Sequence, residues 1–147
     1  MSTKKDKPLL ERPNCIHFNL RKAMRAVTQH YDRILQPVGL RGTQFTILSV
    51  VSLLGQVSIS DLAEQMVIDR TTLTRNLKPL EQEGLIEIAP GEDRRVKVVK
   101  LTAHGRSVLK EAMPYWKEAQ SEMLEHLGEK RAKILLSDLT AAAKIDF

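Results

Sequence analysis

Apolar residues recur at helical spacing through most of the chain, and prolines, glycines and polar segments divide them into separate helices. A first helix is predicted over residues 14–36, with Asn14 as its N-cap and Pro37 just beyond its end. Thr43 is expected to cap a second helix, because residues 44–55, "QFTILSVVSLLG", are apolar on nearly every side. Such a helix is typical of a buried core.

Two shorter amphipathic helices follow, with only a few residues between them. The first has Ser60 as its expected cap and apolar residues at i, i+3, i+4 and i+7 up to Met66. The second begins after Asp69, a favourable N-cap, and ends at Gly84, with leucines at positions 73, 77 and 80 on one stripe. Two short amphipathic helices joined by a tight turn form a helix-turn-helix.

The pattern then changes to the two-residue period of β-strands. Residues 85–90, "LIEIAP", and 94–102, "RRVKVVKLT", are rich in β-branched side chains and are joined by a charged turn. They predict a β-hairpin with a basic exposed side. The expected alternation puts Val96 and Val98 on one face and Arg95 and Lys97 on the other.

Two further helices complete the predicted fold. Thr102 is expected to cap a long helix that contains Pro114, which should kink it, and that ends at Gly128. A last helix has apolar residues at core spacing almost to the C-terminus. The predicted fold class is mainly α with a small β-hairpin wing (α+β), a winged helix-turn-helix within one domain, 1–147. Its predicted parts are a winged helix over 43–101 and flanking helices over 14–36 and 103–145.

Charge refines this picture, because the positive charge is concentrated in the winged part. The 147 residues carry 23 Lys and Arg against 18 Asp and Glu, a net charge of +5, with a pI near 9.5. Nine basic and five acidic residues lie between positions 70 and 110, so most of the excess lies there. Such a distribution favours an anionic partner.

Other features of the composition bear on location. A single Cys excludes an internal disulfide framework. No apolar run approaches the roughly 20 residues of a membrane span. The start "MSTKKDKPLLERP" lacks the apolar region of a secretory signal. We therefore expect a cytoplasmic protein without a membrane partner.

The helix after Asp69 carries short hydroxyl side chains and cations on the face opposite its leucines. On DNA, threonine hydroxyls bond phosphates or base edges, Arg75 is expected to reach guanine and Lys78 the backbone. On the wing, Arg95 suits a narrow minor groove, with Asp93 orienting it through a salt bridge. The alternatives are a solvated helix face and a salt-bridged surface hairpin. The residues predicted to contact DNA are Ser60, Arg70, Thr71, Thr72, Thr74, Arg75, Lys78, Asp93, Arg94, Arg95 and Lys97.

The order of elements, with the segments "DRTTLTRNLKPLEQEGLIE" and "EDRRVKVVKLTAHGR", resembles the MarR family of bacterial transcriptional regulators over nearly the whole chain. The most specific part is the wing, where an Asp and an Arg two positions apart appear as Asp93 and Arg95, before a strand ending in Leu101-Thr102. Pro79 departs from the pattern, because it removes a hydrogen bond inside the predicted recognition helix and should bend its last turn.

The resemblance implies a function. Members of this family are homodimers joined through their first and last helices, here 14–36 and 103–145. They bind short palindromes in double-stranded DNA, usually as repressors, and release DNA when a ligand or an oxidant acts. The chain is thus expected to be a dimeric sequence-specific regulator. The alternative is a winged-helix module that binds an acidic protein and has no sequence-specific DNA binding.

Cys15 is the candidate redox sensor. With Asn14 as the cap, the thiol would lie in the first helical turn, where the helix dipole and Arg12 favour the thiolate. The position is similar to that of the reactive Cys in the organic-peroxide-sensing branch of the family. That branch holds its thiolate with tyrosines, of which this chain has Tyr31 and Tyr115. The alternative is a small apolar residue buried at a dimer interface.

A small aromatic effector is the other candidate signal. Met113, Tyr115 and Trp116 surround Pro114 and are expected either to line an effector pocket or to belong to the core. No nucleophile elbow, phosphate-binding glycine loop or metal-ligand cluster occurs in the sequence, so we expect no enzyme activity, no metal and no cofactor.

Overall fold

The chain is mainly helical, as predicted, in a computed structural model that describes residues 8–146. Short 3₁₀ turns lie at Pro8–Leu10, Arg12–Asn14 and Gln36–Val38. The helices are α1 (Ile16–Leu35), α2 (Gly42–Leu54), α3 (Ile59–Met66), α4 (Arg70–Gln82), α5 (Ala103–Leu127) and α6 (Glu129–Ala142). The strands are β1 (Gln56–Ser58), β2 (Ile86–Pro90) and β3 (Lys97–Leu101).

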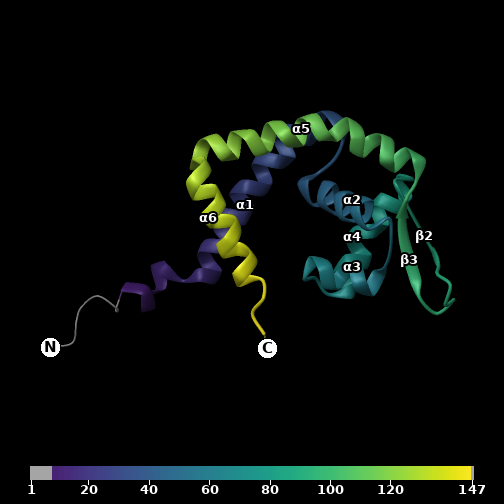
Figure 1. The fold of residues 1–147 in the computed structure, drawn as a ribbon, viewed down its shortest axis with the longest axis horizontal. Coiled ribbons are helices and arrows are strands. Elements are labelled where there is room, and N and C mark those ends of the chain that lie inside the picture. Colours follow the sequence, from purple (N-terminus) through teal and green to yellow (C-terminus); the bar gives the residue numbers. More distant parts are fainter. Residues whose placement is uncertain (1–7, 147) are drawn as a thin grey trace.

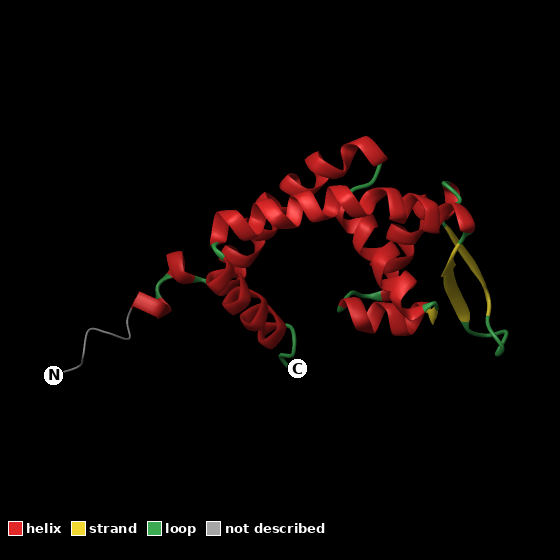
Figure 2. Cartoon of the chain, turned by 45° about the horizontal axis from the view of Figure 1, so that its top comes forward, coloured by secondary structure: helices red, strands yellow, loops and turns green. Residues whose placement is uncertain are grey.

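Helix α5 connects the two halves of the molecule. Figure 1 shows it as a long arch, with α2, α3, α4 and the strands beneath one end and α6 and the start of α1 beneath the other. It continues through Pro114 as a single helix. Figure 2 shows the β2–β3 hairpin projecting away from α5 as a separate wing. No single helix within residues 8–146 is long and apolar enough to cross a membrane. Only α1 and α2 together, bent by 75°, meet that test, and α2 contributes four buried residues to the core.

The core lies inside the winged half of the chain. Helix α2 is apolar nearly all round, as predicted, and the leucine stripe of α4 is fully buried against it and α3. Leu35 at the end of α1 and Leu109 and Ala112 of α5 join the same cluster. Burial of the leucines fixes which face of α4 points outward.

The sheet has three strands in the order β1-β3-β2, all antiparallel. The predicted hairpin is confirmed, but β1 was missed because three residues carry too little periodicity to indicate a strand. The predicted alternation is wrong by one residue. Val99 and Leu101 are buried and pair with the half-buried Ile88 and the buried Ile86, whereas Val96 is 41% exposed.

The cause of this register lies in the turn. Val96 belongs to the loop, where its carbonyl accepts a hydrogen bond from the Gly91 N–H at 2.7 Å and its own N–H donates to Asp93 at 2.9 Å. Strand β3 therefore starts at Lys97, three residues later than the predicted segment 94–102, and the facing β2 isoleucines select Val99 and Leu101 for the core.

Two helix caps are as predicted. The Asp69 carboxylate accepts from the Thr72 N–H at 2.9 Å, and the Thr102 hydroxyl accepts from the Gly105 N–H at 2.9 Å. Gly84, at φ +72°, ends α4 in the left-handed conformation expected of a C-terminal stop.

Three other predicted caps are wrong. Ser58, not Ser60, caps α3, and its hydroxyl accepts from the Asp61 N–H at 3.0 Å. Strand β1 ends at Ser58 and α3 begins at the next residue, so the cap lies two residues before the predicted one. Helix α2 begins at Gly42, so Thr43 already lies in its first turn. Asn14 ends a 3₁₀ turn, in which its amide donates to the Pro8 carbonyl.

Close packing joins the start of α5 to the end of α4. The Thr102 N–H donates to the Leu85 carbonyl at 3.1 Å, and the Thr102 hydroxyl donates to the Gly84 carbonyl. A Cβ on Gly105 would lie 1.9 Å from the Leu85 oxygen. Only a glycine allows α5 to approach this backbone.

We predict that Gly105→Ala lowers the free energy of unfolding by about 1–3 kcal/mol, because the added methyl must displace the Leu85 backbone. Ser107→Ala, at an exposed position in the same helix, is the matched control and should change it little. Urea denaturation followed by circular dichroism makes the measurement. Equal stability of the two variants would show that the contact is not tight.

Candidate nucleic-acid interface

The N-terminus of α4 is organised by Asp69. Its carboxylate accepts from the Thr72 N–H at 2.9 Å and from the Thr72 hydroxyl at 2.7 Å. These bonds, the side-chain one most of all, together with the positive charge of Arg75, hold the pKa of Asp69 below its ordinary value. The Thr72 hydroxyl proton is therefore already in use, and Thr72 is half-buried. Of the predicted contacts on α4, Thr72 belongs to the cap more than to the exposed face.

The remaining predicted residues of α4 form one exposed face. They are Arg70, Thr71, Thr74, Arg75 and Lys78, and each of them is exposed. Helical geometry places Thr71, Arg75 and Lys78 opposite the buried leucines and Thr74 on the flank, whereas Arg70 lies nearer the leucine side in the first turn. Pro79 does not end the helix, which continues to Gln82. The face thus combines three cations with two free hydroxyl side chains.

The tip of the wing carries an oriented arginine. Arg95 donates from its Nε to Asp93 Oδ1 at 3.2 Å, and its side chain is 90% exposed. The Asp93 carboxylate also accepts from the Arg95 backbone N–H at 3.1 Å, and these bonds hold the pKa of Asp93 below its ordinary value. The predicted salt bridge is confirmed. The salt bridge holds the guanidinium of Arg95 in solvent, beside the exposed Arg94.

Two hollows flank α4. One, of about 340 Å³, lies between α4 and the wing and is lined by Thr74, Lys78 and Lys97 among others. It brings Lys78 of the helix and Lys97 of the wing to one groove, which Glu81 also lines. The other, of about 480 Å³, lies between α4 and the start of α2, with Arg75 and Asn76 facing Arg41 and Gln44. Ser60 is exposed on α3 and lines neither hollow.

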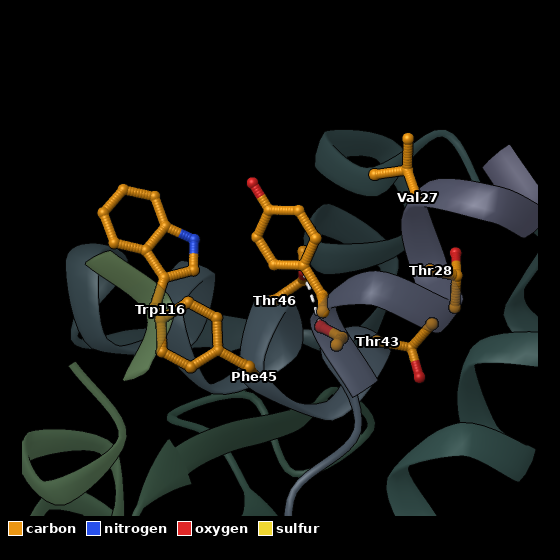
Figure 3. A pocket seen from close by; sticks show the side chains of 8 residues that line it. Val27, Thr28, Thr43, Phe45, Thr46 and Trp116 are labelled. Carbon is orange, nitrogen blue, oxygen red and sulfur yellow. Dashed lines mark hydrogen bonds between the residues drawn. The ribbon is translucent and has the colours of Figure 1, made fainter. Parts of the chain in front are cut away.

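A further cavity, of about 240 Å³, lies where α1, α2 and α5 meet (Figure 3). Trp116 and Phe45 stack along one side, with ring centroids 6.0 Å apart and planes 13° apart. Tyr31 also lines the cavity; its hydroxyl donates to Gln120, and burial raises its pKa. Trp116 packs on the core and also lines the cavity. Tyr115 and Met113 are half-buried against the core.

Known proteins were compared with the whole chain. The family model described as MarR family matches residues 40–97, from the start of α2 to the first residue of β3. The transcriptional regulator FarR of Neisseria gonorrhoeae is 30% identical over 132 residues, which cover 89% of this chain and 90% of FarR. The chain belongs to the MarR family. It is a transcriptional regulator of the winged helix-turn-helix type.

Two solved structures of MarR-type regulators are similar to the chain over most of its length. The Mycobacterium tuberculosis regulator MosR in complex with DNA is 38% identical, with a TM-score of 0.75; the match covers 89% of this chain and 99% of MosR. NadR in complex with 4-hydroxyphenylacetate is 30% identical, with a TM-score of 0.71; the match covers 89% of this chain and 94% of NadR. Both DNA and a small aromatic acid thus occur as ligands among similar proteins.

Some features of this MarR-family chain had no clear signal in the sequence. Arg41 precedes a helix, where a cation is ordinary, and only the fold places it beside α4. Thr28 and Thr46 line the cavity from the flanks of α1 and α2, outside the apolar stripes that sequence analysis follows. Cys15 is exposed in the single chain. It is the N-cap residue of α1, whereas the sequence predicted it one position later, inside the first helical turn.

The cap at Asp69 predicts a pH dependence. Its pKa is lowered in the folded state, so it contributes stability above its ordinary pKa of 3.8, and this is lost as the pH falls towards the lowered value. Between about pH 5 and pH 3, the wild type should lose more unfolding free energy than Asp69→Ser, which keeps a capping oxygen but does not titrate. Urea titrations at both pH values test this. A parallel loss in the two proteins would contradict the assignment.

Proposed function

We propose that the chain acts as a homodimer that binds a palindromic operator in double-stranded DNA, as a repressor. In each subunit α4 enters the major groove with Thr71, Thr74 and Arg75 towards the bases, and the wing places Arg95 in the minor groove. Arg70, Lys78, Arg94 and Lys97 contact phosphates. The supporting observation is the exposed face of α4, which shares a groove with Lys97 of the wing.

Dimerisation is supported by apolar side chains that the single chain leaves exposed. On α1 these are Ile16, Leu20, Met24 and Val27, and on α6 they are Ile134, Leu135, Leu136 and Leu139. The sequence pattern predicted one apolar face on each of these helices, and a second copy of the chain would bury these side chains. A two-fold dimer presents two copies of α4 and therefore fits a palindrome.

We predict that Arg95→Ala weakens operator binding by about 1–3 kcal/mol, because an oriented guanidinium is removed from the minor groove. Dimerisation should be unchanged, since Arg95 lies at the wing tip. Lys117→Ala, which removes an exposed cation on α5 outside the apolar faces of α1 and α6, is the control. Fluorescence anisotropy and sedimentation measure the two properties. Unchanged DNA affinity in Arg95→Ala would favour a protein-binding module instead.

For the signal, we infer a small aromatic effector in the cavity beside Trp116. The cavity joins α1 and α5 to α2, so a ligand there favours one placement of α5 relative to the winged half and shifts the population that fits the operator. NadR, crystallised with 4-hydroxyphenylacetate, supports this chemistry. Oxidation of the exposed Cys15 is the second candidate signal. We further place the protein in the cytoplasm with its DNA and assign it no enzyme activity, cofactor or metal.

One experiment separates the two signals. Operator binding is measured with 4-hydroxyphenylacetate or with an organic hydroperoxide, for the wild type, Thr28→Phe and Cys15→Ser. We predict that the aromatic acid releases wild-type protein and Cys15→Ser but not Thr28→Phe, whose ring fills the cavity. Release by hydroperoxide that Cys15→Ser resists would instead make Cys15 the sensor.

A further inference from the structure

Helix α4 is a ridge with a hollow on either side. Its wing side, carrying Thr74 and Lys78, faces Lys97. Its other side, carrying Arg75, Asn76 and Pro79, faces Arg41, Thr43 and Gln44 at the start of α2. The cations that the sequence predicts to contact DNA lie on α4 and on the wing. None of the predicted DNA contacts lies at the start of α2.

DNA geometry gives both hollows a partner. A helix with its side chains is roughly 10–12 Å across, and the major groove is roughly 12 Å wide, so a helix in the groove fills it from wall to wall. The two sugar-phosphate strands that form these walls then lie along the two sides of the helix. With α4 in the groove, one strand runs past Lys78 and Lys97, and the other runs past the start of α2.

We propose that Arg41 binds the phosphate backbone of the strand opposite the wing, so that α2 and the wing hold the two walls of the major groove. This proposal rests on the DNA binding proposed above. It adds α2 to the DNA-contacting surface and gives that surface a cation on each side of α4. The two positions differ in kind, because Lys97 lies on a projecting wing and Arg41 on the edge of the core.

The backbone of Arg41 is fixed while its side chain is exposed. Its N–H donates to Gln44 Oε1 at 3.0 Å, and its carbonyl accepts from the Phe45 N–H at 2.9 Å. The preceding Leu40 is buried in the core. Because the backbone is already fixed, binding orders only the side chain, and the planar guanidinium suits phosphate oxygens.

Acidic groups near Arg41 define the limits of the site. Glu83 lines the same hollow and would repel a phosphate there. Asp32 lies behind the start of α2, where its carboxylate accepts from the Gly42 N–H at 2.7 Å and is half-buried. Because Asp32 is committed to this bond, Glu83 is the carboxylate that competes with DNA for Arg41.

The test compares Arg41→Gln with Lys117→Gln, a matched loss of one exposed cation, on α5 and outside the apolar faces of α1 and α6. Affinity for the operator and for an unrelated duplex is measured at several salt concentrations. Arg41→Gln should weaken both duplexes to the same degree, roughly three- to tenfold, and lower the slope of log K against log salt by about 0.9, the value of one phosphate contact. Glu83→Gln should strengthen both. Thermal unfolding confirms that the variants fold.

Three outcomes would overturn the proposal. If wild type binds DNA with a steep salt dependence and Arg41→Gln keeps both the slope and the affinity, then α2 does not hold the backbone, and the proposed function stands. If Arg41→Gln loses affinity for the operator alone, then Arg41 contacts bases and not the phosphate backbone. If wild type shows no salt-dependent DNA binding, the proposed function fails, and the proposed phosphate contact of Arg41 fails with it.

Discussion

The packing of Gly105 against the Leu85 carbonyl is the constraint on which the rest of the molecule depends. It joins the first turn of α5 to the residues that end α4, with Thr102 bonded to the same short stretch. At its other end α5 crosses α1, where Tyr31 bonds Gln120 and His30 lies 3.4 Å from Glu122. One helix therefore carries both the recognition helix and the surface through which a second subunit would attach.

This arrangement links the cavity beside Trp116 to the DNA-binding half of the molecule. Trp116 lies on α5 between the two contacts just described, and Phe45 and Tyr31 bring α2 and α1 to the same cavity. Under the proposed effector mechanism, a ligand in this cavity would favour one angle between these helices. Because α5 is tied to the end of α4, that angle sets the separation of the two recognition helices in a dimer.

The sequence predicted features that local chemistry determines. Asp69 and Thr102 are caps because a side chain bonds a backbone N–H three residues away, and the leucine stripe of α4 follows from helical periodicity. The salt bridge between Asp93 and Arg95 is equally local. These features locate the recognition helix and the wing tip, which make up most of the candidate site.

Features that depend on distant partners were missed or misplaced. Ser60 was chosen as a cap because β1, which pairs with β3 some forty residues later, gave no signal of its own. Val99 faces the core because Ile88 pairs with it, whereas the local alternation favoured Val98. Arg41 comes near α4 only through the packing of α2. In each case the deciding contact is tertiary, and a pattern along one segment does not contain it.

The most direct test of the central claim is to select binding sites for the wild-type protein from a random library of duplex DNA. Two copies of α4 related by two-fold symmetry predict enrichment of one palindrome, with half-sites separated by about one helical turn of roughly 10 base pairs. Recovery of such a palindrome, bound by one dimer, would establish dimeric sequence-specific recognition. A library that remains random after repeated selection would contradict it.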